Sequence, residues 1–151
     1  MIRYTTGNLL QAPAEALVNA VNCVGVMGKG IALQFKQQFP ENYEAYRSAC
    51  DRGDVRPGQV FVYPTGQPTG VRFIVNFPTK RHWKDNSRLE DIETGLDALV
   101  GVIQEHQLKS IAIPALGCGL GGLDWPTVRN LIEQKLSPLA DVTILVYAPQ
   151  S

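Results

Sequence analysis

The sequence has no long hydrophobic run and few side chains that bind metals. No apolar stretch comes near the roughly 18 residues that a membrane-spanning helix needs, and we find no signal peptide or lipidation motif. We therefore expect a cytoplasmic protein with no membrane partner. Only two histidines and three cysteines are present, at spacings that fit neither a zinc site nor a disulfide framework. We expect no metal and no cofactor.

The chain also lacks an excess of either charge. Its 14 acidic residues balance its 14 basic ones, and charged residues make up 19% of the total. Zero net charge argues against a surface that nucleic acid covers entirely, but it leaves room for a local basic patch. With 151 residues, 44% of them hydrophobic, the chain is long enough for one domain with a sizeable core. We expect residues 1–151 to form a single domain and a monomer.

Short hydrophobic runs alternate with helical patterns along the whole chain. This alternation predicts an α/β fold, in which helices cover both faces of a sheet and ligands bind beyond the carboxyl ends of the strands. The runs predict strands at 2–5, from 16 onward, 60–63, 71–77, 110–115 and 142–147. The helical patterns predict helices from 30 to the residue before Pro40, at 40–50, at 89–103 and after Asp124.

Several residues mark where these helices should begin. Pro40 and Pro126 suit the first turn of a helix, where the missing N–H would have no partner in any case. Asp124 is the expected N-cap of the last helix. Ser87 is followed three residues later by Glu90, which is the pattern of a capping box.

The stretch from Ala16 to Phe35 combines a buried strand, three glycines and the start of a helix. Glycines let backbone N–H groups come close to an anion, and the N-terminus of a helix favours negative charge. The glycine spacing matches neither the dinucleotide fingerprint nor the Walker loop. A phosphate-bearing ligand and a glycine-rich turn without any ligand therefore both fit. The side-chain amides of Asn19 and Asn22 at the strand end favour the ligand, because they can donate and accept hydrogen bonds.

A second glycine-rich loop follows the strand at 110–115. Gly117, Gly119 and Gly122 have the G-x-G-x-x-G spacing of nicotinamide enzymes, but the acidic residue that such a site needs at the end of the next strand is missing. Asp141 lies at the start of that strand, and too little chain remains for the second half of a Rossmann sheet. Because both glycine loops follow buried strands, we expect them to meet at one edge of the sheet.

Two motifs together resemble those of the macrodomain family of ADP-ribose-binding modules. They are Val18-Asn-Ala-Val-Asn-Cys-Val-Gly-Val-Met-Gly-Lys-Gly-Ile-Ala32 and Ile113-Pro-Ala-Leu-Gly-Cys-Gly-Leu-Gly-Gly122, and the likeness spans nearly the whole chain. The segment 22–30 with Asn76-Phe-Pro-Thr-Lys80 resembles the branch of terminal ADP-ribose protein glycohydrolases and bacterial antitoxin DNA ADP-ribosyl glycohydrolases. The loop at 80–88 favours the antitoxin group.

The resemblance implies a three-layer α/β/α fold around a central mixed sheet. It implies hydrolysis of the N-glycosidic bond between ADP-ribose and thymine bases of single-stranded DNA, which reverses a cognate DNA ADP-ribosyltransferase toxin of the DarT type. Antitoxins of this kind usually carry a further domain, which would make this chain one piece of a longer protein. Two other activities stay open: a reader that binds ADP-ribose without cleaving it, and a hydrolase of ADP-ribosylated protein carboxylates or O-acetyl-ADP-ribose.

The resemblance also assigns the binding residues. Asn8 and Leu9 are expected to meet the adenine, although the family usually has aspartate where this chain has Asn8, and Tyr147 to flank the adenosine. The two glycine loops are expected to hold the diphosphate and the distal ribose. The full set is Asn8, Leu9, Asn19, Gly25, Val26, Met27, Gly28, Lys29, Gly30, Ile31, Gly117, Cys118, Gly119, Leu120, Gly121, Gly122 and Tyr147.

Lys80 matches the catalytic lysine of this branch, and Asn22 is expected to fix the distal ribose or the attached base. A lysine with the usual pKa near 10.4 is almost entirely protonated at pH 7, so attack by its amine requires desolvation or nearby cations. A neutral amine would attack the anomeric carbon, whereas an ammonium would donate a proton to the departing group. Both roles fit the sequence, as does a surface ammonium that steadies a phosphate. The protein-directed enzymes use an aspartate in the second loop, where this chain has Gly121.

Residues 80–88 hold four basic side chains and one acidic one in an otherwise neutral protein. Cations that meet phosphates and an indole that stacks on a base suit single-stranded nucleic acid. The alternative is a solvated loop whose Trp83 covers the following helix. Cys23 and Cys118 are expected to be half-buried filler rather than nucleophiles. The expected nucleic-acid contacts are Arg81, His82, Trp83, Lys84 and Arg88.

Overall fold

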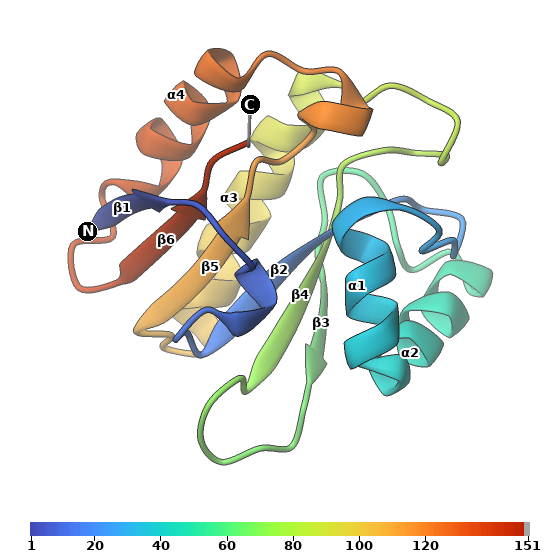
Figure 1. Ribbon diagram of the computed structural model, residues 1–151, viewed down its shortest axis with the longest axis horizontal. Coiled ribbons are helices and arrows are strands. Elements are labelled where there is room, and N and C mark those ends of the chain that lie inside the picture. The colour runs from blue at the N-terminus through green and yellow to red at the C-terminus, as the bar shows by residue number, and fades with distance from the viewer. Residues whose placement is uncertain (150–151) are drawn as a thin grey trace.

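The computed structural model describes residues 1–149, and these form one six-stranded sheet with helices on both faces (Figure 1). The strands are β1 (Ile2–Thr5), β2 (Ala16–Val21), β3 (Phe61–Pro64), β4 (Phe73–Pro78), β5 (Ser110–Pro114) and β6 (Thr143–Tyr147). The helices are α1 (Gly30–Gln38), α2 (Pro40–Asp51), α3 (Leu89–Glu105) and α4 (Trp125–Leu136), with short 3₁₀ turns η1 (Leu9–Gln11) and η2 (Gly119–Gly121).

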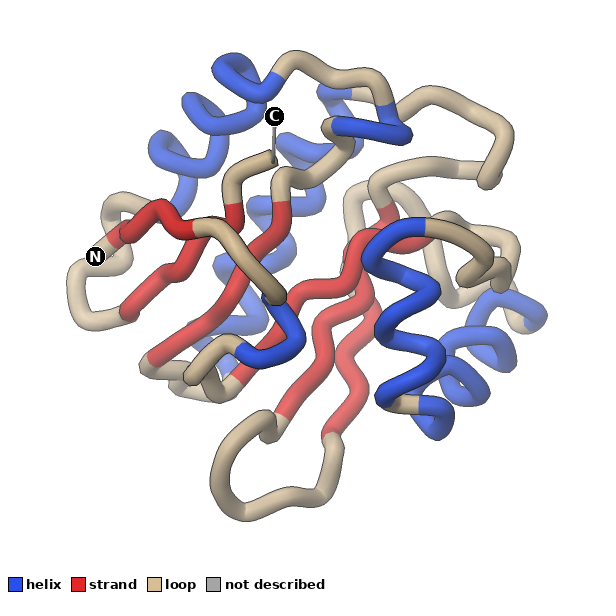
Figure 2. Tube along the Cα trace, viewed as in Figure 1, coloured by secondary structure: helices blue, strands red, loops and turns tan. Residues whose placement is uncertain are grey.

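The sheet is mixed, as expected. Its strand order is β1-β6-β5-β2-β4-β3, and every pair of neighbours is parallel except β3 and β4, which run antiparallel. In Figure 2 the red strands form a central layer between two sets of blue helices. The predicted strands are all present, with ends that differ by one or two residues for β3, β4, β5 and β6.

Two helical layers bury opposite faces of β2. Ala16 and Val18 pack in a cluster with side chains of α3 and α4, whereas Leu17 packs with Phe35 of α1 and with η1. Successive side chains of a strand point to opposite faces, so a strand covered on both sides must be hydrophobic at nearly every position. This explains why five of the six β2 residues are apolar, and it confirms the three-layer α/β/α architecture.

The helix starts agree with the sequence at two of three places. Pro40 opens α2, and the Asp124 side chain accepts a hydrogen bond from the Thr127 amide at 3.2 Å as the N-cap of α4. The capping box at Ser87 is wrong, because α3 begins one residue later, with Arg88 at the N-cap position and no side-chain cap. The Ser87 hydroxyl is instead buried beneath the second glycine loop and has no hydrogen-bond partner within residues 1–149.

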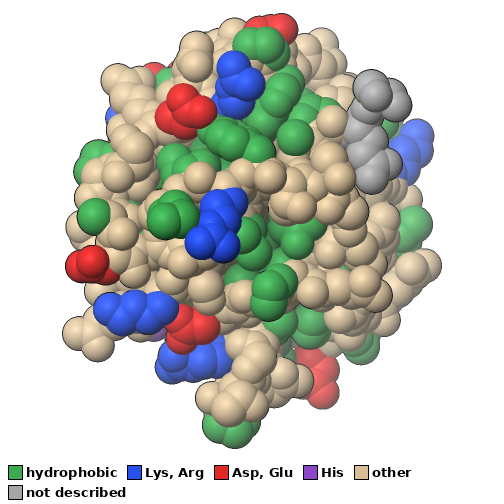
Figure 3. Space-filling model, turned by 60° about the vertical axis from the view of Figure 1, so that its left-hand side comes forward, with side chains coloured by type: hydrophobic (Ala, Val, Ile, Leu, Met, Phe, Trp, Pro, Cys, Tyr) green, Lys and Arg blue, Asp and Glu red, His purple; other side chains and the backbone are tan. Residues whose placement is uncertain are grey.

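One face of the molecule is drawn as a space-filling view in Figure 3. On the face seen in Figure 3, basic and acidic side chains are interspersed with hydrophobic ones, in keeping with the zero net charge. No helix within residues 1–149 is long and apolar enough to span a membrane.

Candidate functional site

A cavity of about 540 Å³ opens at the carboxyl ends of three parallel strands. Val21 and Asn22 line it at the end of β2, Lys80 just beyond β4, and Pro114 and Ala115 at the end of β5. This is the edge where ligands bind in sheets of this kind. The remaining walls come from the two glycine loops.

The first glycine loop supplies one wall. Gly28, Lys29, Gly30 and Ile31 line the cavity together with Val26. Lys29 occupies the N-cap position of α1 without a side-chain cap, and the first turn of α1 contains no acidic residue. The first N–H groups of α1 therefore lack side-chain partners and lie beside the cavity, as anion binding requires.

Two expected members of this loop do not line the cavity. Met27 is 1% exposed and packs in the cluster of α2 side chains. Gly25 has a φ of +83° and lies against Arg47, where an added Cβ would be 3.6 Å from the arginine side chain. Both residues support the loop from beneath.

The second glycine loop closes the opposite wall. Gly117, Cys118, Leu120 and Gly121 line the cavity, whereas Gly119 and Gly122 do not. The loops come together at Gly30, where an added Cβ would be 3.6 Å from a methyl carbon of Leu120. The expected meeting of the two loops at one edge is thus confirmed.

Gly121 has no room for a side chain. A Cβ at this position would collide with the Ser87 hydroxyl and lie 3.1 Å from the Ser87 Cβ. The Ser87 amide also donates a hydrogen bond to the Gly121 carbonyl at 2.9 Å, which fixes the two residues together. A side chain at position 121, a carboxylate included, would therefore require Ser87 to move.

Asn22 holds the first glycine loop in shape. Its side-chain oxygen accepts hydrogen bonds from the amides of Val24 at 3.0 Å and Val26 at 3.3 Å, and its side-chain nitrogen donates to the Val26 carbonyl at 2.8 Å. The Tyr46 hydroxyl lies 2.8 Å from the same Asn22 oxygen. Sequence reasoning missed Tyr46, and the one available signal was a polar aromatic residue on a helix face that must be buried.

Asn19 lies inside β2 and does not line the cavity. It is fully buried, and its side-chain nitrogen donates to the Asn76 side-chain oxygen at 3.3 Å. Asn76 and Asn42 also exchange hydrogen bonds, at 3.2 and 2.8 Å. Asn19 thus belongs to a buried cluster of amides between the sheet and α2.

A second hollow adjoins the cavity. Asn8, Leu9 and Tyr147 line it, and it shares Ile31 and Pro114 with the first cavity. The Asn8 side-chain oxygen accepts a hydrogen bond from the Leu10 amide at 3.1 Å and so caps η1. The three residues expected around adenosine thus lie together, next to the glycine loops.

Lys80 reaches the cavity from just beyond the end of β4. The amides of Thr79 and Lys80 donate to the Val21 carbonyl at 2.8 and 3.4 Å, which extends the pairing of β4 with β2 past the last strand residues. The Lys80 side chain is half-buried, and its amine lies 3.5 Å from the Trp83 carbonyl.

The loop after Lys80 exposes an aromatic ring at the cavity mouth. Trp83 is 48% exposed and lines the cavity rather than covering α3. The His82 ring lies 5.3 Å from the Trp83 ring, and the Lys84 amine lies 5.0 Å from it. Arg88 is exposed, whereas the Arg81 guanidinium forms an ion pair with Asp91 on α3.

The thiols near the site are protonated. Burial raises the pKa of Cys23 to about 11 and also raises the pKa of Cys118. Both side chains are half-buried, as expected, and neither has the lowered pKa of a thiolate nucleophile. Among residues 1–149, no three His, Cys, Asp or Glu side chains gather as a group that could hold a metal ion.

The fold and the site define an α/β/α protein with a cavity between two glycine loops at the carboxyl ends of its parallel strands. The chain belongs to the macro domain family, whose model matches residues 18–132. It is 56% identical over 149 residues to the DNA ADP-ribosyl glycohydrolase of Thermus aquaticus, covering 99% of this chain and 41% of that relative. The chain therefore spans about two fifths of the length of that relative.

Two solved structures extend the comparison. The macrodomain of Mycobacterium tuberculosis DarG superposes with a TM-score of 0.97 at 52% identity, covering 99% of both chains. The structure of Thermosipho africanus DarTG in complex with ADP-ribose superposes with a TM-score of 0.91 at 35% identity, covering 98% of this chain and 41% of that one.

Proposed function

We propose that this protein is a DNA ADP-ribosyl glycohydrolase that acts in the cytoplasm. It removes ADP-ribose from thymine bases of single-stranded DNA and so reverses a cognate DNA ADP-ribosyltransferase toxin. The observation that carries the proposal is the convergence of both glycine loops and Lys80 on one cavity. The names of the Thermus and Mycobacterium relatives support DNA as the substrate.

In this proposal, the nucleotide lies along the two adjoining hollows. Adenosine occupies the hollow lined by Asn8, Leu9 and Tyr147. The diphosphate lies between the glycine loops, where the N–H groups at the start of α1 can donate hydrogen bonds to its oxygens. The distal ribose then lies at the end lined by Asn22 and Lys80.

The Lys80 amine acts at the anomeric carbon of the distal ribose. As a neutral amine it attacks that carbon and displaces the base, which takes up the proton that the amine nitrogen loses. Opening of the ribose ring at its C–O bond then gives an imine, and water hydrolyses this imine to release the lysine. As an ammonium it donates a proton to the departing base while water attacks. Borohydride added during turnover distinguishes these routes, because only the amine route gives a reducible imine on Lys80, detectable by mass spectrometry.

The modified DNA strand is proposed to cross the cavity mouth at Trp83. A base can stack on the exposed indole, which is worth about 1–3 kcal/mol per base, and His82, Lys84 and Arg88 lie in the same loop. The exposed side chains of Val26 and Leu120 add apolar area at this mouth.

The test is release of ADP-ribose from an ADP-ribosylated single-stranded oligonucleotide. We expect rapid release by the wild type and none by Lys80→Ala, while Lys109→Ala, the same change at an exposed lysine outside the cavity, releases at the wild-type rate. Equal release by Lys80→Ala would remove Lys80 from the mechanism. A wild type that binds ADP-ribose but releases none would identify a reader instead.

Two further measurements test the substrate class. Side-by-side turnover of modified DNA and modified protein carboxylates should favour DNA, and the reverse preference would identify a protein-directed enzyme. Lys84→Ala and Arg88→Ala should slow release from DNA and flatten its salt dependence without changing the affinity for free ADP-ribose. An unchanged salt dependence would argue against a DNA contact in this loop.

A further inference from the structure

Arg81 and Asp91 form a two-point ion pair beside the site. The Arg81 Nε lies 3.2 Å from one Asp91 carboxylate oxygen, and its terminal Nη2 lies 3.2 Å from the other. The Asp91 side chain is 7% exposed, in the first turn of α3. An acidic group in that turn is favourable for the helix, and the planar fork of arginine fits a carboxylate at both oxygens.

The backbone next to this ion pair is also held. The Cys23 amide donates to the Arg81 carbonyl at 3.3 Å, and the Cys23 thiol lies 3.6 Å from the Lys80 carbonyl. Residues 80 and 81 are thus attached to the first glycine loop through their backbone and to α3 through the Arg81 side chain.

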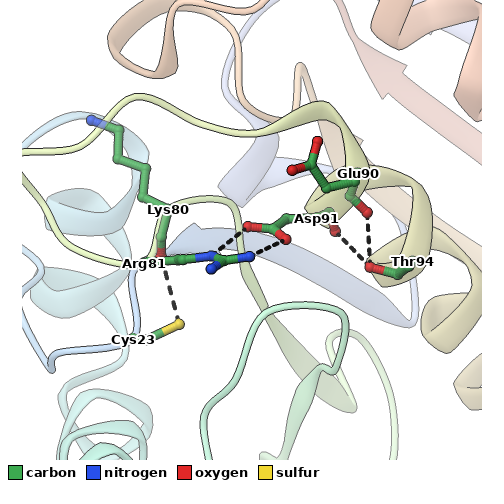
Figure 4. A network of polar contacts seen from close by, with 6 residues as sticks. All are labelled: Cys23, Lys80, Arg81, Glu90, Asp91 and Thr94. Atoms are coloured by element: carbon green, nitrogen blue, oxygen red, sulfur yellow. Dashed lines mark hydrogen bonds and ion pairs between the residues drawn. The ribbon is translucent and has the colours of Figure 1, made fainter.

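The Arg81 side chain and the Lys80 side chain leave the chain in different directions. In Figure 4 the Arg81 guanidinium extends to Asp91, while the Lys80 side chain extends away from that ion pair. Lys80 and Arg81 are adjacent in the chain, so holding Arg81 on the α3 side restricts the backbone at Lys80. The Lys80 side chain is thereby kept toward the cavity that it lines.

We propose that Arg81, held in place by Asp91, is a positioning residue for Lys80. In this proposal Arg81 makes no contact with nucleic acid. This inference rests on the proposed glycohydrolase activity. It gives Arg81 a different role from the DNA contact that the composition of the loop predicts. Lys84 and Arg88 keep the role of DNA contacts.

The first experiment is a double-mutant cycle on an ADP-ribosylated single-stranded oligonucleotide. We expect Arg81→Gln and Asp91→Asn each to lower kcat by about 10- to 100-fold, because a misplacement near 1 Å can have that effect. The double variant should lose no more than either single variant, since both changes break the same contact. KM and its dependence on salt should stay at the wild-type values.

A DNA contact by Arg81 predicts the opposite pattern. Arg81→Gln would then raise KM and flatten its salt dependence, and Asp91→Asn, which releases the guanidinium, would leave kcat intact. Arg81→Lys separates the two roles further, because lysine keeps the charge but loses the two-point geometry. Positioning predicts a low kcat for Arg81→Lys, and a DNA contact predicts nearly full activity.

Asp97→Asn is the matched control. Asp97 also lies on α3 and forms an ion pair, at 3.0 Å with Lys135, but away from residues 80 and 81. The control makes the same change of charge and should leave kcat unchanged. An equal fall in kcat in Asp97→Asn would attribute the effect to α3 as a whole and overturn the proposal.

A second measurement needs no substrate. We expect amide hydrogen exchange at Lys80 to be faster in Asp91→Asn than in the wild type, with the slow amides of the central strands unchanged. Unchanged exchange at Lys80 would overturn the positioning role even if the glycohydrolase activity is established. Failure of the wild type to release ADP-ribose would instead overturn the proposed function, and the exchange result would still decide whether Asp91 holds the loop.

Discussion

The buried hydroxyl of Tyr46 lies 2.7 Å from the backbone oxygen of Asn22 and 2.8 Å from its side-chain oxygen. Tyr46 belongs to α2 and is completely buried, whereas Asn22 follows the end of β2 and organises the first glycine loop. Burial raises the pKa of Tyr46, so the hydroxyl keeps its proton and acts as the donor. A single hydroxyl therefore connects the helical layer to the loop that faces the ligand.

Tyr46→Phe should weaken ADP-ribose binding while preserving the fold. The substitution keeps the ring but removes the donor to Asn22, which costs about 1 kcal/mol of stability. A less ordered loop should lower the affinity for ADP-ribose by about tenfold, equivalent to 1.4 kcal/mol. Titration calorimetry and thermal unfolding measure both effects. The control is Tyr63→Phe, since that hydroxyl contacts Glu41 on the surface; equal affinities for the two variants would rule out the Tyr46 link.

Gly121→Ala should destabilise the protein because the added Cβ collides with Ser87. Overpacking of this kind costs about 1–3 kcal/mol. In a Ser87→Gly background the same substitution should cost less, because the colliding atoms are gone. Urea unfolding measures the difference, with Gly101→Ala as the control. Gly101 lies in α3 with open space around it, so alanine there should add roughly 0.5–1 kcal/mol of stability. A Gly121→Ala variant as stable as the wild type would show that the Ser87 contact can relax freely.

Asn19→Ala should lower stability without changing the affinity for ADP-ribose. The Asn19 amide donates to Asn76 inside the protein and does not reach the cavity. Loss of one such hydrogen bond costs about 1 kcal/mol. Thermal unfolding and calorimetry with free ADP-ribose test the two halves of the prediction. A large loss of affinity for ADP-ribose at unchanged stability would instead show that Asn19 takes part in binding.

The strands, the helices and the meeting of the glycine loops could be predicted from the sequence because each depends on a local pattern. Apolar runs covered on both faces fix the parallel strands, and β2 and β5 each end a few residues before the glycines. The alternation of side chains along β2 was also available, and it puts Asn19 on the same face as Leu17, toward α1 and α2.

The contacts that shape the site could not be predicted because they join distant elements. Tyr46 and Asn22 are 24 positions apart, and Ser87 meets Gly121 across two different loops. The sequence shows Ser87 ahead of a helix with Glu90 three positions later, which fits a cap equally well. Packing beneath the second glycine loop decides against the cap, and Arg88 instead of Ser87 occupies the N-cap position of α3.

Glu15 should make the stability of the protein depend on acid pH. The Lys109 amide donates to its carboxylate at 2.7 Å and the Arg72 guanidinium at 2.9 Å, and these contacts, led by the Lys109 amide, lower its pKa in the folded state. A carboxylate with a lowered folded-state pKa adds stability above its unfolded pKa, near 4.5, and loses that stability as the pH falls through the folded value.

Glu15→Gln should therefore be less stable than the wild type at pH 7, by about 1 kcal/mol for a partly exposed pair, and the two proteins should converge in stability as the pH falls well below 4. Urea unfolding at pH 7, 5 and 3 measures the difference, with Asp54→Asn in the exposed Arg52 pair as the control. A difference between wild type and Glu15→Gln that stays constant across this range would show that the carboxylate charge contributes nothing and that only its hydrogen-bond geometry matters.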